Sequence, residues 1–148
     1  MGSYIKIYTD GGARGNPGPS ASAFLVINNS KIIYKGSRYL GKATNNEAEY
    51  NAVIDAYEWL TQSSLRETIK KVVFNIDSEL VVKQLQEKYR TKSENLKPLI
   101  ARIKSLENIL KKEVVYKTVP REANKLADKL VNQKLDLMQH TENFDENI

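Results

Sequence analysis

With 148 residues, the chain is long enough for one domain with its own hydrophobic core, and its formal net charge is +5. It contains no cysteine, which excludes disulfides, zinc–thiolate sites and thiol nucleophiles, and its one histidine, His140, lies in a polar C-terminal stretch, which disfavours triads and metal sites built on histidine. Any chemistry must therefore come from carboxylates, hydroxyls, lysines and bound ions.

The first predicted element is a strand that ends on a carboxylate. Residues 4–10 alternate with the period of two that a β-strand needs, and the following stretch, Gly11 to Pro19, is rich in turn residues. Asp10 would therefore lie at the end of a strand, at the edge of the sheet. A carboxylate that is desolvated there must be protonated, paired or bound to a metal. The turn is not a Walker-type phosphate loop, because it lacks the Gly-Lys-Ser/Thr ending and leads into a strand.

Two more strands and a helix follow. Residues 21–27 are small and then strongly apolar, residues 28–30 form a tight turn, and residues 31–40 alternate as a return strand, which predicts a three-stranded antiparallel meander. From residue 46 the period becomes helical, with these apolar positions: Ala48, Ala52, Val53, Ala56, Tyr57 and Leu60. Thr44, Asn45 or Asn46 can cap this helix.

Two glutamates at the start of this helix differ in their predicted direction. At about 100° per residue, Glu49 falls in the middle of the apolar stripe, whereas Glu47 falls on the opposite face, toward solvent. Glu49 could be a structural ion-pair partner. No lysine or arginine shares its face of the helix, however, which favours metal ligation or acid–base work.

A later predicted strand, like the first one, ends on an aspartate. Residues 70–77 carry a nearly continuous apolar run, typical of a central strand covered on both faces, and close on Asp77. Ser78 can cap a helix that extends to Lys88. A polar connection, an amphipathic helix over 96–110 and a short strand over 114–119 follow.

The last predicted helix spans residues 122–137, and its apolar positions are Ala123, Leu126, Ala127, Leu130 and Val131. Asp128 lies on the flank of that face, and the pattern alone favours an exposed aspartate. We expect one domain over residues 1–137 and an acidic, disordered tail over 138–148. There is no apolar run long enough to span a membrane and no signal-peptide pattern, so we expect a cytoplasmic protein without a membrane partner.

Positive charge is concentrated between Lys83 and Lys112. This segment has nine basic and three acidic residues, a net +6 that exceeds the charge of the whole chain. It is either a face that binds a polyanion or an ordinary solvated helix surface.

The order of elements predicts an α/β sandwich with a mixed sheet. If the strands that end at Asp10 and Asp77 are parallel neighbours, both carboxylates emerge at one edge, and the first turn of the Glu49 helix can reach them. Three close acids do not all stay ionised at neutral pH without a cation. Oxygen ligands favour magnesium or manganese, and a pair of such ions about 3.5–4 Å apart serves phosphoryl transfer.

Five motifs carry a resemblance to a known family. They are Thr9-Asp10-Gly11-Gly12, Gly15 to Pro19, Thr44 to Tyr50, Ile76-Asp77-Ser78 and Asn124 to Leu130. In this order they closely resemble the motifs of type 1 ribonuclease H, over about residues 4–137. The resemblance implies the ribonuclease H-like fold, whose five-stranded mixed sheet has three antiparallel strands and then two parallel ones, flanked by helices.

The resemblance also implies a function. Family members are endonucleases that hydrolyse the RNA strand of RNA/DNA hybrids with two divalent ions, Mg²⁺ or else Mn²⁺, and leave 5′-phosphate and 3′-hydroxyl ends. Their catalytic, metal-binding carboxylates match Asp10, Glu49, Asp77 and Asp128. Their substrate-contacting residues match Asn16, Thr44, Asn45 and Asn46, which suit contacts to backbone and groove without sequence reading. We expect a monomer.

The sequence departs from the family pattern in three places. The loop before the last helix lacks the histidine of well-studied bacterial members and resembles the archaeal-like branch, in which an arginine takes that place. Arg121 is the candidate, although it could be an ordinary loop arginine. The loop from Lys88 to Lys97 is too short for the extra basic helix of some members, and Glu79 stands where an uncharged groove-contacting side chain is common.

Two other functions remain open at this point. One is a non-catalytic module that binds hybrids or double-stranded RNA. The other is a nuclease of the same fold that acts on DNA or on RNA/RNA duplexes. Acids that line an anion-binding site would hinder binding if no metal were held there, which argues against the binding module.

Overall fold

A computed structural model describes residues 4–146. Its strands are β1 (Tyr4–Ala13), β2 (Gly18–Asn28), β3 (Lys31–Ala43), β4 (Lys71–Ile76) and β5 (Glu113–Thr118). Its helices are α1 (Asn45–Gln62), α2 (Glu79–Leu85), α3 (Lys97–Leu110) and α4 (Lys125–Glu146), with 3₁₀ turns at Ser64–Glu67 and Arg121–Asn124.

The five strands form one mixed sheet in the order β3-β2-β1-β4-β5. The first three pair antiparallel, and β1, β4 and β5 pair parallel. This confirms the predicted architecture. It follows from short connections within the meander and a helical connection before each parallel strand, because parallel neighbours need a crossover.

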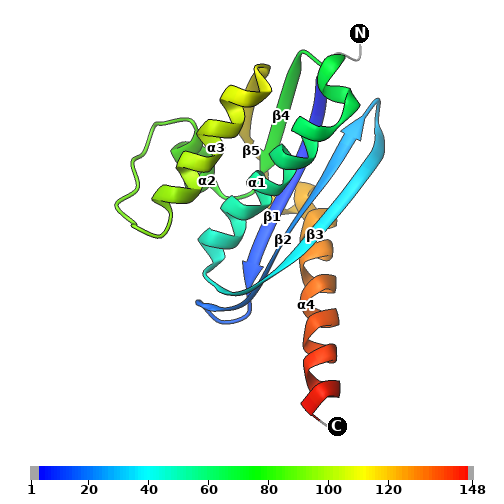
Figure 1. Cartoon of the computed structure of the whole chain (residues 1–148), viewed down its shortest axis with the longest axis vertical. Coiled ribbons are helices and arrows are strands. Elements are labelled where there is room, and N and C mark those ends of the chain that lie inside the picture. The colour runs from blue at the N-terminus through cyan, green and yellow to red at the C-terminus, as the bar shows by residue number, and fades with distance from the viewer. Residues whose placement is uncertain (1–3, 147–148) are drawn as a thin grey trace.

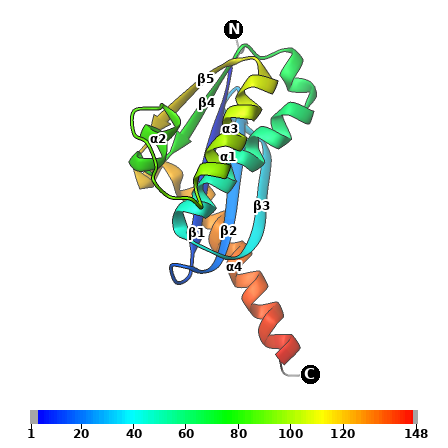
Figure 2. The ribbon, with the colours of Figure 1, turned by 60° about the vertical axis from the view of Figure 1, so that its left-hand side comes forward.

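Helices cover the two faces of the sheet unequally (Figure 1). The main core lies between the sheet and helices α1, α2 and α3, where apolar side chains such as Ile7, Tyr57 and Phe74 are fully buried. On the other face, α4 contributes Val131 and Leu135 to a smaller apolar cluster. Figure 2 shows that the last turns of α4 then project from the body of the molecule.

Strand β1 continues past Asp10, where the sequence predicted a turn. It pairs with β2 as far as Ala13, opposite Ser20, so only the next four residues form the turn. Gly11 makes this continuation compatible with α1, because a Cβ at that position would lie 2.2 Å from the carbonyl carbon of Ala48. The first turn of α1 therefore lies against the strand that carries Asp10.

The start of α1 is fixed by a capping box. Thr44 is the N-cap residue: its hydroxyl accepts a hydrogen bond from the Glu47 N–H at 3.1 Å, and the Glu47 carboxylate accepts one from the Thr44 N–H at 2.9 Å. The expectation that Glu47 points to solvent is therefore wrong, because its side chain folds back to satisfy a free N–H of the helix terminus.

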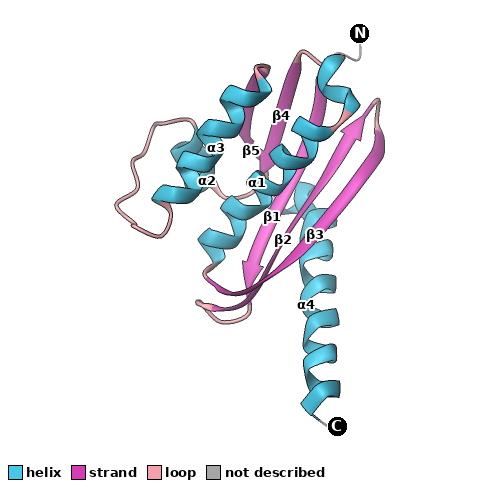
Figure 3. Cartoon of the chain, viewed as in Figure 1, coloured by secondary structure: helices cyan, strands magenta, loops and turns pink. Residues whose placement is uncertain are grey.

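The predicted disordered tail is wrong for residues 138–146, because α4 continues to Glu146 (Figure 3). No proline or glycine interrupts this stretch. The guanidinium of Arg14 also donates a hydrogen bond to the Gln139 side chain at 2.9 Å, which stabilises this part of the helix. Residues 147–148 lie outside the described range. The predicted apolar face of α4 is also wrong in part: Leu126 is 53% exposed, whereas Val131 and Leu135 are buried.

Across residues 4–146, the helices are too short or too polar to cross a membrane.

Candidate active site

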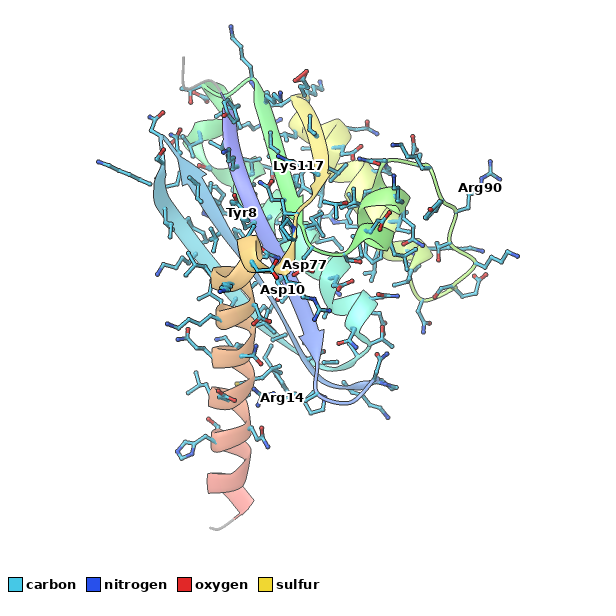
Figure 4. All side chains as sticks on the ribbon, turned by 180° about the vertical axis from the view of Figure 1, so that it is seen from behind. Tyr8, Asp10, Arg14, Asp77, Arg90 and Lys117 are labelled. Carbon is cyan, nitrogen blue, oxygen red and sulfur yellow. The ribbon has the colours of Figure 1, made fainter. Side chains whose placement is uncertain are left out.

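Asp10 and Asp77 come together because β1 and β4 are parallel neighbours. Their pairing ends at Thr9 opposite Ile76, so the two aspartates follow directly at the same end of adjacent strands. Figure 4 shows both beside the start of α4. Asp10 still lies within β1, whereas Asp77 is the first residue after β4.

Glu49 reaches this end of the sheet from the first turn of α1. Its Oε2 atom is buried without a hydrogen-bond partner among the described residues. Burial and the neighbouring charge of Asp77 raise the pKa of Glu49 to about 7, while the Ser78 hydroxyl and the Arg121 guanidinium act in the opposite direction. Glu49 thus points inward, as the helical spacing predicts.

The environment of Asp10 connects all four candidate carboxylates. Burial is the main cause that raises the pKa of Asp10 to about 8, and repulsion from Asp77, Asp128 and Glu49 adds to it, against a hydrogen bond from the Gly11 N–H. Asp10 therefore interacts electrostatically with each of the other three acids. Near neutral pH and without a cation, Asp10 and Glu49 retain protons.

Asp128 joins the group from α4, on the far side of the sheet from α1. It is exposed, as its position on the helix flank predicts, but it lines the same cleft as the other three carboxylates. Asn132, one turn later, donates a hydrogen bond to its carboxylate at 3.4 Å. The packing of α4 on the sheet brings Asp128 to the site.

Asn124 belongs to the site although the sequence analysis did not select it as a site residue. It is buried, and its amide nitrogen donates to the Thr9 carbonyl at 2.8 Å and to the Asp77 carboxylate at 3.2 Å. It therefore connects the 3₁₀ turn before α4 to β1 and to the residue that follows β4. The sequence signal was its place in the matched motif from Asn124 to Leu130, but the predicted helix over 122–137 placed Asn124 inside the helix, whereas the structure places it in the 3₁₀ turn before the helix.

The carboxylates line a cleft of about 560 Å³. Its wall also includes basic and polar side chains, namely Arg14, Arg121, Lys125 and Asn132. Within residues 4–146, no three acidic or histidine side chains are already arranged as a metal-binding cluster. The buried, unpartnered Glu49 oxygen and the mutual repulsion of the acids nevertheless leave oxygen donors that a hard cation could satisfy.

The four candidate substrate residues meet at the entrance to α1. Asn16 accepts a hydrogen bond from the Asn45 N–H at 2.9 Å, and Asn45 accepts one from the Ala13 N–H at 2.8 Å. Thr44 caps the helix, and Asn46 is half-buried in its first turn. These side chains thus hold the two loops together, and the exposed Asn16 and Asn45 lie at the surface beside the cleft.

The basic segment from Lys83 to Lys112 covers the end of α2, the long loop that follows it, and α3, with Arg90 at its outer edge in Figure 4. Part of its charge is paired: Lys97 contacts Glu94 at 2.8 Å, and Lys104 contacts Glu107 at 3.4 Å. Some charges of the segment are therefore neutralised and others, such as that of Arg90, lie on an exposed side chain, so both interpretations of the segment stay open.

Comparison with known proteins agrees with this geometry. A family model described as reverse transcriptase-like matches residues 8–134. Ribonuclease HI of Halobacterium salinarum is 34% identical over 136 residues, which cover 91% of this chain and 66% of that protein. A bifunctional protein of Mycobacterium tuberculosis is 31% identical over 134 residues, which cover 89% of this chain and 35% of that protein. The chain therefore spans from about a third to two thirds of the length of these relatives.

Solved structures extend the comparison to three dimensions. An RNase H1 isolated from compost by a metagenomic approach is 38% identical, with a TM-score of 0.87 over 93% of this chain and 99% of that one. A second crystal structure of that protein, in complex with an RNA/DNA hybrid, has a TM-score of 0.86 over 91% of this chain and 99% of the other.

Proposed function

Since the chain belongs to the type 1 ribonuclease H family, we propose that it is an endonuclease that hydrolyses the RNA strand of RNA/DNA hybrids. The observation that carries the proposal is the group of four carboxylates, brought from β1, α1, the end of β4 and α4 into one cleft. The similar RNase H1 solved with a hybrid supports the choice of substrate. All four acids come from a single chain, which is consistent with an active monomer.

We propose that the carboxylates hold two divalent ions, Mg²⁺ or alternatively Mn²⁺. Asp10 would be shared by both ions, with Glu49 and Asp77 at one and Asp128 at the other. Such ions supply an activated water and stabilise the leaving oxygen of a phosphodiester, which leaves 5′-phosphate and 3′-hydroxyl ends. The raised pKa values of Asp10 and Glu49 support this assignment, because a cation would replace the protons that these acids otherwise retain.

The other residues of the site would bind and orient the hybrid. Asn16, Thr44, Asn45 and Asn46 would contact its backbone and minor groove, where hydroxyl and amide groups do not read sequence. Glu49 would also lie near the 2′-hydroxyl of the cleaved strand. Arg121 would act through its charge, since a guanidinium stays protonated and cannot relay a proton as a histidine can.

A panel of end-labelled substrates of one sequence tests the function. RNA/DNA, DNA/DNA and RNA/RNA duplexes and single-stranded RNA are incubated with Mg²⁺, with Mn²⁺ or with chelator, beside the Asp10→Asn variant. The proposal requires that the RNA strand of the hybrid is cut, and that chelator and the substitution both abolish cutting. Hybrid binding without cleavage in either metal would instead identify a binding module, and preferential cutting of another duplex would identify a different nuclease.

A further inference from the structure

The turn between β1 and β2 is tied to α4 by Arg14. Its guanidinium donates to the carboxylate of Asp136 at 2.6 Å, to Gln139 at 2.9 Å and to the side-chain oxygen of Asn132 at 3.3 Å. In Figure 4, Arg14 lies alongside α4 below the two labelled aspartates. The residues in contact are more than 110 positions apart in the sequence.

Arg14 determines which way the Asn132 amide points. A guanidinium is only a donor, so it must face the amide oxygen, and the NH₂ group then points away from it. That NH₂ group donates to the backbone oxygen of Asp128 at 3.1 Å and to its carboxylate at 3.4 Å. Two contacts therefore connect Arg14 to the carboxylate of Asp128.

Asp128 depends on such a contact more than the other three carboxylates do. Asp10 and Glu49 are restricted by burial, and Asp77 is held by the buried amide of Asn124. Asp128 is exposed on a helix flank, where its side chain would sample several rotamers unless a neighbour restricted it.

We propose that Arg14 and Asn132 form a positioning relay that orients the Asp128 carboxylate toward the cleft for divalent-ion binding; this rests on the proposed function. The same turn carries Asn16, whose side chain holds the start of α1. The relay thus links the candidate substrate loop to the carboxylate that reaches the cleft from the opposite face of the sheet.

The relay is tested by Mg²⁺ binding to the full chain without nucleic acid, measured by titration calorimetry and by the shift of thermal unfolding with Mg²⁺. Arg14→Met and Asn132→Leu should each weaken Mg²⁺ binding by roughly tenfold. This is the low end of the loss in metal affinity expected when the hydrogen-bond partner of a metal ligand is removed. The control is Arg66→Met. Arg66 lies in the 3₁₀ turn before β4, at the opposite end of the sheet from the cleft, and the substitution removes a 2.6 Å hydrogen bond to the carbonyl of Ile109 in α3. The control should bind Mg²⁺ as the unmodified chain does.

A double-variant cycle separates positioning from general stabilisation. In an Asp128→Asn background, Arg14→Met should cause no further loss of Mg²⁺ affinity. If Arg14 only stabilised the fold, the substitution would weaken Mg²⁺ binding by the same factor in this background as in the unmodified chain. In hybrid cleavage, excess Mg²⁺ should restore the kcat of Arg14→Met without a change in KM. Unchanged Mg²⁺ affinity with a raised KM would overturn the relay and make Arg14 a substrate contact.

The relay and the proposed function can fail separately. If the unmodified chain cleaves hybrids but neither variant alters Mg²⁺ binding, the relay is wrong and the function stands. If the chain does not cleave hybrids but both variants weaken Mg²⁺ binding, the relay stands and the function is wrong. A chain that binds no divalent ion would overturn both.

Discussion

Gly11 lies against Ala48 so closely that a Cβ at position 11 would come within 2.2 Å of the Ala48 carbonyl carbon and 2.5 Å of the Glu49 nitrogen. This contact brings the first turn of α1, and with it Glu49, beside the strand that carries Asp10. The site is assembled here because two backbones meet without a side chain between them.

The Gly11→Ala substitution should therefore displace α1 from β1. The added methyl group would overlap backbone atoms, which cannot rotate away, so we expect a loss of roughly 1–3 kcal/mol in the free energy of unfolding. Chemical denaturation measures this loss. Gly12→Ala is the matched control, because its Cβ would meet only a Val131 methyl group at 3.7 Å. Equal stability of the two variants would contradict the proposed steric role of Gly11.

The stability of the metal-free protein should fall as the pH rises from about 4 to about 8. Folding raises the pKa of Asp10 from 3.8 to about 8 and that of Glu49 from 4.5 to about 7. The folded state therefore binds more protons than the unfolded state over this range, and stability decreases with pH. Thermal unfolding in chelator at several pH values measures the slope.

Two controls accompany the pH series. Asp10→Asn should flatten the slope, because it removes the acid with the larger shift. Added Mg²⁺ should raise the melting temperature most at the alkaline end, where the carboxylates are ionised and free to bind it. A melting temperature that is independent of pH in chelator would show that these carboxyls are not perturbed by folding.

Replacing Asn124 should impair both stability and catalysis. Asn124→Leu would leave the Thr9 carbonyl without this buried donor and release the Asp77 carboxylate, at a cost of about 1–3 kcal/mol in unfolding free energy. The rate of hybrid cleavage should also fall at Mg²⁺ concentrations that saturate the unmodified protein. Asn124→Asp is the informative partner, because it keeps the shape but adds a charge beside Asp77. It should lose more activity at pH 8 than at pH 6, which a purely steric role would not predict.

The charge of Arg121 should matter more than its shape. The guanidinium lowers the pKa of Glu49, so Arg121→Gln should raise that pKa further and reduce kcat. We expect a loss of about tenfold, less than the roughly 100-fold cost of removing a donor from a buried oxyanion hole, because Arg121 is exposed. Arg121→Lys keeps the charge and should retain most of the activity. Steady-state cleavage at saturating Mg²⁺ distinguishes the two, and equal losses in both variants would argue for a geometric role instead.

Features that depend on neighbouring residues could be predicted from the sequence alone. The period of two marked the strands, and the helical period placed Glu49 inward in α1. The shared edge of Asp10 and Asp77 followed from the predicted parallel pairing of their strands. These inferences work because side-chain direction within a strand or helix is set by the local backbone.

Features made by contacts between distant segments required the tertiary structure. Glu47 caps α1, β1 continues beyond Asp10, and α4 continues to Glu146, none of which the local pattern predicted. Asp128 looked like an ordinary exposed aspartate because its role depends on which face of the sheet α4 covers. The contacts of Asn124 and Arg14 likewise join residues more than a hundred positions apart. Such contacts depend on how whole elements pack, and a periodicity of two or of 3.6 residues carries no information about that packing.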